Sequence, residues 1–220
     1  MLTLGYIITA LLSYLLGSIP AGFLVARAKG VDIRTVGSGN IGATNVFRSI
    51  GKLPGSIVFI VDAVKGYLAC EIVGSLGARW FAVSSSDAVQ EFFLVLAGFV
   101  AVLGHNYTCW LGFKGGKGIA TSAGVLLALF PKALLVVLGI WILVFAVSRY
   151  VSLASIIGAF WLPVFVGLFS YSRQCVIVAA ILTVLAIYKH KSNIQRLIAG
   201  TEHRFGDKQP APEDSASSIP

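Results

Sequence analysis

The chain consists of long apolar segments joined by short polar loops. The segments lie at about residues 3–27, 55–77, 89–104, 119–130, 132–147, 153–170 and 173–188. A helix needs about 20 apolar residues to cross a bilayer, and the longer segments reach that length. Because 57% of the 220 residues are hydrophobic and only 12% are charged, a soluble domain is excluded. The pattern predicts an all-α integral membrane protein with about seven transmembrane helices, some of them short.

Two short segments, 119–130 and 132–147, are divided by Pro131 and Lys132. We interpret them as a hairpin of short helices that need not cross the membrane fully. The alternative is one long tilted helix kinked at Pro131, which would reverse the orientation of every later segment.

The distribution of basic residues indicates an orientation when seven segments are assumed with the N-terminus outside. The outer side then receives only Arg79, Lys132 and Arg173, Lys65 lies within a span, and the rest of the 17 lysines and arginines fall on the inner side. Basic loops are typical of the cytoplasmic side, so the C-terminus is expected there. The net charge of +8 is explained by these loops and does not indicate a nucleic-acid partner.

No long polar linker divides the chain, so residues 1–205 are expected to form one membrane domain. Residues 206–220 are polar and rich in proline, serine and alanine, a composition that predicts a disordered tail.

The sequence GFKGGKG at residues 112–118 is a glycine-rich loop with two basic side chains, Lys114 and Lys117. Glycines allow backbone N–H groups to surround an anion, and the following helix adds its N-terminal dipole. The spacing does not match a Walker A motif. The loop predicts a phosphate site made by Lys117 and the backbone of Gly115, Gly116 and Gly118; a flexible basic turn is the alternative.

A second glycine loop, GSGNIGATNVFR at residues 37–48, ends at Arg48. Gly39 and the polar side chains of Ser38, Asn40, Thr44 and Asn45 give it hydrogen-bonding groups, although such residues are also ordinary turn formers. Its glycine spacing resembles a dinucleotide fingerprint, but no strand precedes it and that reading is rejected.

A third polar cluster follows the last apolar segment. In a helix, His190 and Asn193 would share one face, and a histidine among cations suits chemistry on anions. A lone interfacial histidine is the alternative. Asp62 and Lys65, three residues apart within a span, are interpreted as a matched structural pair. Ser152 and Ser155 lie near the inner face and are candidates for the same site.

The loops hold no acidic cluster for a metal between phosphates, which indicates a metal-free reaction. A transporter or anion channel is the competing class, because basic loops and short helices also suit phosphate passage. The polar clusters nevertheless gather on one predicted face. A phosphotransferase acting on lipid head groups is a third class, and it usually requires metal-binding carboxylates.

Three stretches together resemble the signature motifs of one family: residues 37–48, then GHNY at 104–107 with GFKGGKGIAT at 112–121, then HKSNIQRL at 190–197. The family is the bacterial acyl-phosphate:glycerol-3-phosphate acyltransferases (PlsY). The resemblance extends from the first span to about Arg204. Ile41 departs from it, because the family often has proline there, and the polar tail is an extension expected to be dispensable.

The resemblance implies a seven-helix enzyme of the bacterial cytoplasmic (inner) membrane with its site at the cytoplasmic surface. Its reaction would transfer a fatty acyl group from acyl phosphate to the 1-hydroxyl of glycerol 3-phosphate, giving lysophosphatidic acid and inorganic phosphate. No cofactor and no obligate protein partner are implied besides these substrates and the bilayer. The motifs carry over as site residues Ser38, Arg48, Lys117, Ser155, His190 and Asn193.

Within that reaction, Lys117 and its glycine loop are expected to hold one phosphate, and Arg48 with Ser38 the other anion or the oxyanion. His190, oriented by Asn193, is the hypothesised general base. The alternative is that a substrate phosphate takes the proton and His190 only forms a hydrogen bond. Acyl phosphate is already activated, so no covalent acyl-enzyme is needed.

Overall fold

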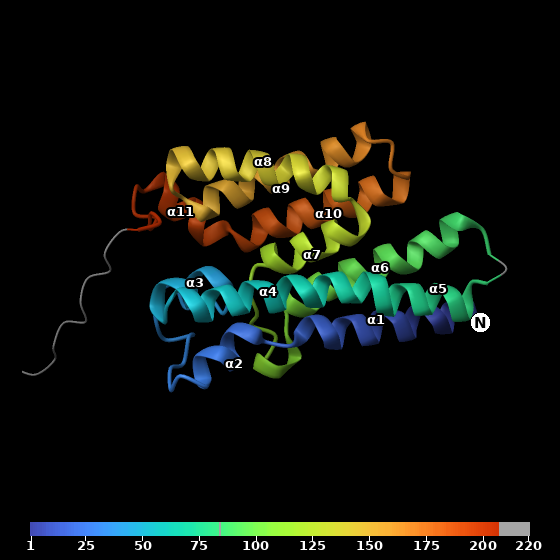
Figure 1. Ribbon diagram of the computed structural model, residues 1–220, viewed down its shortest axis with the longest axis horizontal. Coiled ribbons are helices and arrows are strands. Elements are labelled where there is room, and N and C mark those ends of the chain that lie inside the picture. Colours follow the sequence, from blue (N-terminus) through green and yellow to red (C-terminus); the bar gives the residue numbers. More distant parts are fainter. Residues whose placement is uncertain (84, 207–220) are drawn as a thin grey trace, which may run out of the picture.

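The computed structural model describes residues 1–83 and 85–206, which fold into helices without a strand (Figure 1). The elements are α1 (Leu2–Ser18), α2 (Ala21–Arg27), α3 (Ala43–Ser49), α4 (Lys52–Leu68), the π-helical turn η1 (Ala69–Gly74), α5 (Ser75–Phe81), α6 (Asp87–Asn106), the 3₁₀ turn η2 (Cys109–Leu111), α7 (Ile119–Leu129), α8 (Pro131–Ser148), α9 (Val151–Leu168), α10 (Arg173–Lys189) and α11 (Lys191–Ile198). The long helices lie roughly lengthwise in the molecule, as expected for a membrane bundle. The predicted tail, residues 206–220, lies outside the described residues except for Gly206.

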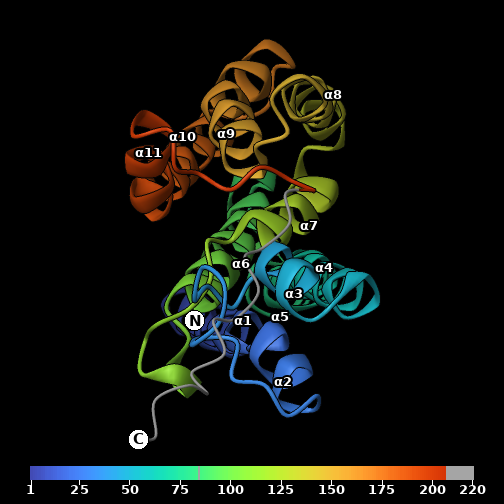
Figure 2. The same cartoon turned by 90° about the vertical axis from the view of Figure 1, so that its left-hand side faces the viewer.

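The end-on view in Figure 2 shows two groups of helices with α6 and α7 between them. One group contains α1 to α5, and the other contains α8 to α11. α1 packs on α6, α4 packs on α7, and α8 packs on α9. Close helix approach depends on small residues: a Cβ on Gly17 of α1 would overlap the backbone of Ala101 on α6.

The first predicted segment is broken into α1 and α2. α1 ends at Ser18, Ile19 leaves the helical conformation with ψ 114°, and Pro20 follows. A residue before proline is disfavoured in the α conformation, which explains the break. The backbone oxygen of Ile19 accepts a hydrogen bond of 2.7 Å from Lys65 Nζ on α4.

The second predicted segment is longer than expected. α4, the π-helical turn and α5 follow one another without interruption from Lys52 to Phe81. A π-helical turn shifts the faces of the helix that follows it, and here it lies where α4 and α5 contact α6.

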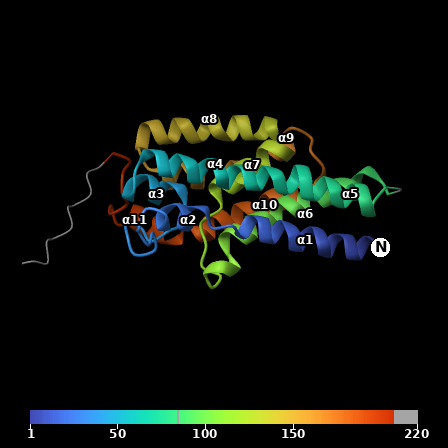
Figure 3. The same ribbon diagram turned by 60° about the horizontal axis from the view of Figure 1, so that its bottom comes forward.

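The hairpin predicted around Pro131 is present, and the kinked single helix is excluded. Phe130 has φ −135° and ψ 54°, so α7 ends there and Pro131 begins α8. In Figures 1 and 3 the chain reverses direction between the two helices. α7 has 11 residues and is too short to cross fully, whereas α8 has 18 and is long enough.

By length and apolar composition, four helical stretches of the described chain qualify as membrane spans: Leu2–Arg27, Asp87–Leu111, Pro131–Ser148 and Val151–Leu168. A fifth is the pair Arg173–Lys189 and Lys191–Ile198, bent by 56°. α8 exposes Leu135, Leu143 and Val147, as a helix facing lipid would. The prediction of about seven crossings and the orientation of the chain stay predictions.

Candidate functional site

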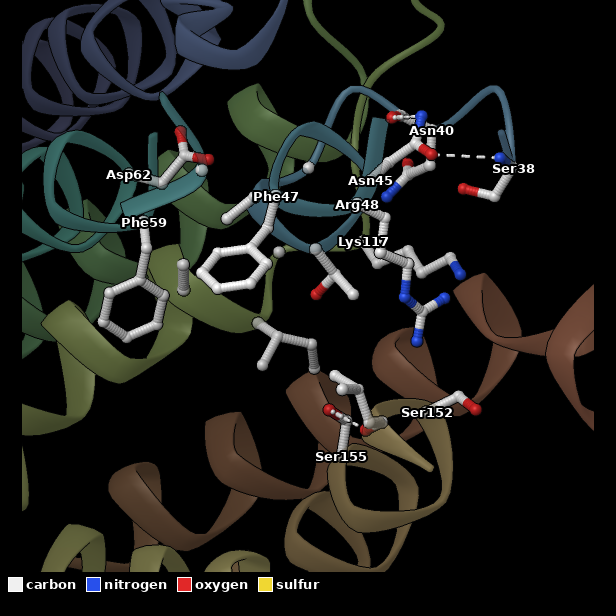
Figure 4. Close-up of a pocket in the computed structure, with 18 of the residues that line it drawn as sticks. Ser38, Asn40, Asn45, Phe47, Arg48, Phe59, Asp62, Lys117, Ser152 and Ser155 are labelled. Carbon is white, nitrogen blue, oxygen red and sulfur yellow. Dashed lines mark hydrogen bonds between the residues drawn. The ribbon is translucent and has the colours of Figure 1, made fainter. Parts of the chain in front are cut away.

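The first glycine loop is shaped by Asn45, whose side chain is buried at the start of α3. Its Nδ2 donates to the backbone oxygens of Asn40 (2.9 Å) and Val36 (3.1 Å). Its Oδ1 accepts from the backbone N–H of Ser38 at 3.0 Å (Figure 4). Gly39 has φ +68°, a left-handed conformation that glycine adopts without strain. Asn45 therefore organises the loop, while Ser38 stays exposed at its tip.

α3 carries the basic side chain of this loop inward. Arg48 lies in its last turn and donates from Nη2 to the backbone oxygen of His203 at 3.2 Å. In Figure 4, Arg48 and Lys117 lie together at one end of a cavity, and Phe59 and Asp62 lie at the other. Two cations at one end provide charge for an anion.

In the second glycine loop, two of the backbone N–H groups expected to bind phosphate instead bind backbone oxygens of α6. The N–H of Gly115 donates to the backbone oxygen of Asn106 (3.2 Å), and the N–H of Gly116 donates to that of His105 (3.1 Å). These two N–H groups hold the loop on the end of α6. Gly118, with φ +80°, caps α7, and the first helical residues Ile119 and Ala120 line the cavity. The positive end of the α7 dipole is therefore the backbone group that faces a ligand.

Lys117 belongs to a chain of polar contacts that crosses the site. Its Nζ donates to Asn193 Oδ1, and Asn193 Nδ2 donates to Glu202 Oε1 at 2.6 Å. Ser152 Oγ donates to the same carboxylate oxygen at 2.7 Å, and Arg196 Nε donates to Glu202 Oε2 at 2.7 Å. Glu202 orients the Asn193 amide, which in turn fixes Lys117.

Burial and neighbouring charges set the protonation of this chain. Burial lowers the pKa of Lys117 to about 8, the Glu202 carboxylate opposes that shift, and Arg196 and Arg48 add to it. Burial alone would raise the pKa of Glu202. The hydrogen bonds from Ser152, Asn193 and Arg196 outweigh it, so its pKa is lowered. Lys117 therefore carries its charge at neutral pH and loses it in mildly basic solution.

His190 lies at the junction between α10 and α11, outside both helices. Its Nδ1 is 2.7 Å from the backbone oxygen of Ala186. A carbonyl oxygen only accepts, so Nδ1 carries the proton and Nε2 is left as an acceptor. Burial lowers the pKa of His190 to about 4, with Lys117 adding to the shift and the hydrogen bond to Ala186 opposing it. The ring is neutral at pH 7.

The two serines of α9 have different surroundings. Ser152 binds Glu202, as described above. Ser155 Oγ donates to the backbone oxygen of Val151 (2.8 Å) and accepts from Trp141 Nε1 (3.2 Å). Both line the cavity, with Ser152 in the polar network and Ser155 beside the aromatic wall.

Two cavities meet at Lys117. The larger has a volume of about 570 Å³ and contains apolar walls from Phe59, Ile60, Trp141 and Phe145. The smaller has a volume of about 220 Å³ and is lined by polar and basic residues, including Lys189 and Arg196. Ser38, Asn40 and Lys117 line both.

The sequence-predicted site residues are mostly brought together here. The larger cavity is lined by Ser38, Asn40, Thr44, Asn45, Arg48, Lys117, Gly118, Ser155 and His190, and the smaller also by Gly39, Gly115 and Gly116. Asn193 joins them through Lys117. Lys114 is exposed and lines neither cavity. Within residues 1–83 and 85–206, no three His, Cys, Asp or Glu side chains lie together as a metal site.

Asp62 and Lys65 form the structural ion pair expected from the sequence, with Nζ and Oδ1 2.8 Å apart and both side chains buried. The sequence did not predict that His105 joins them, its Nδ1 lying 3.4 Å from Asp62 Oδ1.

The fold and these cavities define a class: a helical integral membrane protein with a basic, partly buried site that opens into an apolar cavity. The family model described as glycerol-3-phosphate acyltransferase matches residues 7–200. A glycerol-3-phosphate acyltransferase of Desulforamulus reducens is 47% identical over 90% of this chain and 94% of its own length. The enzyme of the same name from Thermosynechococcus vestitus is 47% identical over 91% of this chain and 95% of its own.

Solved structures with a similar fold belong to enzymes of the same description. The crystal structure of PlsY, an integral membrane glycerol 3-phosphate acyltransferase, in its glycerol 3-phosphate form has a TM-score of 0.81 and 41% identity, covering 91% of this chain and 96% of that one. Its lysophosphatidic acid form has a TM-score of 0.78. The chain belongs to the glycerol-3-phosphate acyltransferase family, and the resemblance inferred from the three motifs is confirmed.

Proposed function

We propose that this protein transfers a fatty acyl group from acyl phosphate to the 1-hydroxyl of glycerol 3-phosphate, releasing lysophosphatidic acid and inorganic phosphate. The observation that carries the proposal is the pair of cavities joined at Lys117, one basic and small, the other larger and walled by aromatic and aliphatic side chains. The crystal forms of the related PlsY, with glycerol 3-phosphate and with lysophosphatidic acid, support a substrate and a product of this type.

The smaller cavity suits the phosphate of glycerol 3-phosphate, since Lys117, Lys189 and Arg196 gather around it. The larger cavity suits acyl phosphate, with the chain beside Phe59, Trp141 and Phe145 and the phosphate near Arg48 and Lys117. Lys117 at the junction offsets the repulsion between the two anions.

The transfer is a direct displacement. The 1-hydroxyl oxygen of glycerol 3-phosphate attacks the acyl carbonyl carbon, and the bond between that carbon and the phosphate oxygen breaks. Inorganic phosphate leaves with the electron pair. Because acyl phosphate is a mixed anhydride, orientation and charge stabilisation by Lys117, Arg48 and the α7 dipole are the main tasks, and no covalent acyl-enzyme forms. The protein's own cations fill the role that a metal would otherwise have.

The hydroxyl proton has two candidate acceptors, His190 and a substrate phosphate. A neutral His190 with a pKa of about 4 is a weak base, whereas the second pKa of a phosphate monoester is about 6. The pKa values favour the phosphate as acceptor, with His190 Nε2 accepting a hydrogen bond that orients the hydroxyl. Asn193 then acts by holding Lys117 and not by orienting His190.

The site is proposed to face the cytoplasm in a bacterial inner membrane. α3, which follows the first glycine loop, and α11 lie at the end of the molecule opposite the N-terminus, and the second glycine loop lies nearer the middle (Figure 1). Most basic residues belong to these loops and to the segment around α11. Basic loops favour the cytoplasmic side. Water-soluble glycerol 3-phosphate would then enter from the cytoplasm.

The test uses protein purified in detergent with palmitoyl phosphate, glycerol 3-phosphate and a chelator, and follows phosphate release. Palmitoyl-CoA serves as a second donor. Lys117→Ala removes the proposed junction charge, and Lys191→Ala is the matched control, an exposed lysine that lines neither cavity. Phosphate release that requires glycerol 3-phosphate, survives Lys191→Ala and is lost in Lys117→Ala supports the proposal. Folded protein that is inactive with palmitoyl phosphate, or that uses only palmitoyl-CoA, contradicts it.

A further inference from the structure

A buried charged cluster has no role in the reaction described above, although two of its members, Asp62 and His105, line the larger cavity. Asp62, Lys65 and His105 are 1%, 3% and 5% exposed. Asp62 Oδ1 is 2.8 Å from Lys65 Nζ and 3.4 Å from His105 Nδ1. Buried charges are costly unless they are paired, so the three side chains hold one another in a fixed arrangement.

The cluster is anchored at one end. Lys65 Nζ also donates to the backbone oxygen of Ile19 at 2.7 Å, in the break between α1 and α2. Lys65 and Asp62 belong to α4, and His105 belongs to α6. The position of the His105 ring on α6 is therefore tied to α4 and, through Lys65, to the break between α1 and α2.

At the other end the cluster meets the second glycine loop. The backbone oxygen of His105 accepts from the N–H of Gly116 at 3.1 Å. The His105 ring also lies directly against Gly116, because a Cβ added there would overlap ring atom Nε2. Gly116 does not have a positive φ, so glycine is needed at this position for space and not for backbone conformation.

Asn106, the residue after His105, also binds the loop. The backbone oxygen of Asn106 accepts from the N–H of Gly115 (3.2 Å) and from Lys189 Nζ (3.0 Å). Gly115, Gly116, Lys117 and Lys189 all line the smaller cavity. The last turn of α6 thus supports one wall of the basic cavity, with the His105 side chain against Gly116 and the Asn106 side chain against Gly118.

We propose that His105, held by Asp62, is a positioning residue for the acyl transfer: its ring sets the place of Gly116 and thereby the place of Lys117 in the smaller cavity. The inference rests on the proposed function. A shift of about 1 Å in a positioning group is enough to reduce turnover markedly. Because Gly116 and Lys117 line the smaller cavity, the effect includes the binding of glycerol 3-phosphate; His105 and Asp62 themselves line the larger cavity.

The experiment is a double-mutant cycle between His105→Ala and Gly116→Ala. His105→Ala is expected to raise KM for glycerol 3-phosphate about 10-fold. Gly116→Ala alone is expected to lower kcat/KM by about 10-fold, because its methyl group displaces the loop from the ring. In the His105→Ala background the same substitution is expected to change kcat/KM by less than about 2-fold, because the space is free.

Two further variants separate positioning from general stability. His105→Asn retains a polar group toward Asp62 but lacks the ring edge against Gly116, so it is expected to show the same KM increase with a smaller loss of thermal stability. Glu91→Gln is the matched control. It weakens a polar contact with Gln174, 2.5 Å away, between α6 and α10 and lines neither cavity, so it is expected to leave KM unchanged.

The inference would be overturned if the fold-losses in kcat/KM caused by His105→Ala and Gly116→Ala multiply in the double variant. An unchanged KM for glycerol 3-phosphate in folded His105→Ala or, if that variant does not fold, in His105→Asn would also overturn it. Wild-type protein measured in the same assay keeps the two proposals apart. Failure of the wild type contradicts the acyltransferase proposal, whereas an active wild type with unaffected His105 variants contradicts only the positioning role.

Discussion

At the scale of single residues, the charge of Lys117 controls the proposed site. Its pKa of about 8 lies well below the ordinary value of a lysine, mainly because the side chain is buried, and the Glu202 carboxylate keeps it from falling further. A protonated Lys117 at pH 7 can bind phosphate, and it loses this ability as the pH rises through its pKa.

We therefore expect kcat/KM for glycerol 3-phosphate to fall as the pH rises above about 8. Glu202→Gln removes the charge that raises the pKa of Lys117, so the fall is expected to begin at lower pH. In Lys117→Arg the side chain stays protonated, so the decrease of kcat/KM at high pH is expected to be mostly absent, although the activity itself is expected to be lower than in the wild type. The measurement is a pH profile of phosphate release for the three proteins. A profile that is the same in wild type and Lys117→Arg would show that another group titrates.

The two lysines of the glycine loop are expected to differ sharply. Lys117 lines both cavities, whereas Lys114 is exposed and lines neither. Lys117→Ala is expected to reduce kcat/KM by at least about 10²-fold, the cost of losing a preorganised electrostatic group. Lys114→Ala is expected to remain within about 2-fold of the wild type. Comparable losses in both variants at fixed ionic strength would contradict this assignment.

The sequence predicts the basic residues of the site better than the residues that hold them in place. Lys117, Arg48 and His190 could be named because they lie in glycine-rich or polar stretches between apolar segments. The sequence assigns no role to Glu202, because its partners Ser152, Asn193 and Arg196 come together only through the fold. His105 lies within a motif, but its contact with Asp62 depends on how α4 and α6 pack. Asn45 was expected to bind substrate, and its observed contacts are to the loop itself.

At the scale of elements, the segment after α11 closes the site. Phe205 contacts Phe47 and Phe145, with ring centroids 5.5 and 5.4 Å away. Its backbone N–H donates to the backbone oxygen of Arg149 at 2.8 Å. Together with Glu202, this segment links α3, α8 and α9 across the end of the larger cavity.

Two truncations test this role. A chain that ends after Gly206 keeps these contacts and loses only the predicted tail, so we expect nearly wild-type activity. A chain that ends after Gly200 loses Glu202 and Phe205, leaving Arg196 without its ion pair and Asn193 without its acceptor. We expect it to lose activity and much of its thermal stability. Phosphate release and thermal unfolding in detergent measure both, and an active chain ending after Gly200 would contradict the closing role.

The element boundaries show which sequence signals were sufficient. Proline next to a short apolar segment correctly predicted the hairpin at Pro131. Pro20 gives a weaker signal, because apolar residues continue on both sides of it, and the sequence therefore predicts α1 and α2 as one segment. The π-helical turn between α4 and α5 has no comparable signal in the sequence; in the fold it packs against α6.

At the scale of the whole molecule, the positions of charges agree with the arrangement of helices. In Figures 1 and 3, α5 ends near the N-terminus, and α8 begins at whichever of its two ends is nearer to the N-terminus. In Figure 1, α10 also begins at its end nearer to the N-terminus. These are the places of Arg79, Lys132 and Arg173, the only basic residues assigned to the outer side. α3, which follows the first glycine loop, lies toward the opposite end. The fold thus separates most basic residues from these three, while the number of crossings and the orientation stay predictions.

Orientation in the membrane is tested with single cysteines in a background lacking Cys70, Cys109 and Cys175, which are all free thiols. Lys132→Cys, at the start of α8, is expected to react with a membrane-impermeant maleimide added to intact spheroplasts. Lys52→Cys, at the start of α4 near the site, is expected to react only after the membrane is permeabilised. Each variant must retain phosphate-releasing activity. Labelling of Lys52→Cys in sealed cells would place the proposed site outside, where cytoplasmic glycerol 3-phosphate has no access, and would contradict the orientation on which the proposed function depends.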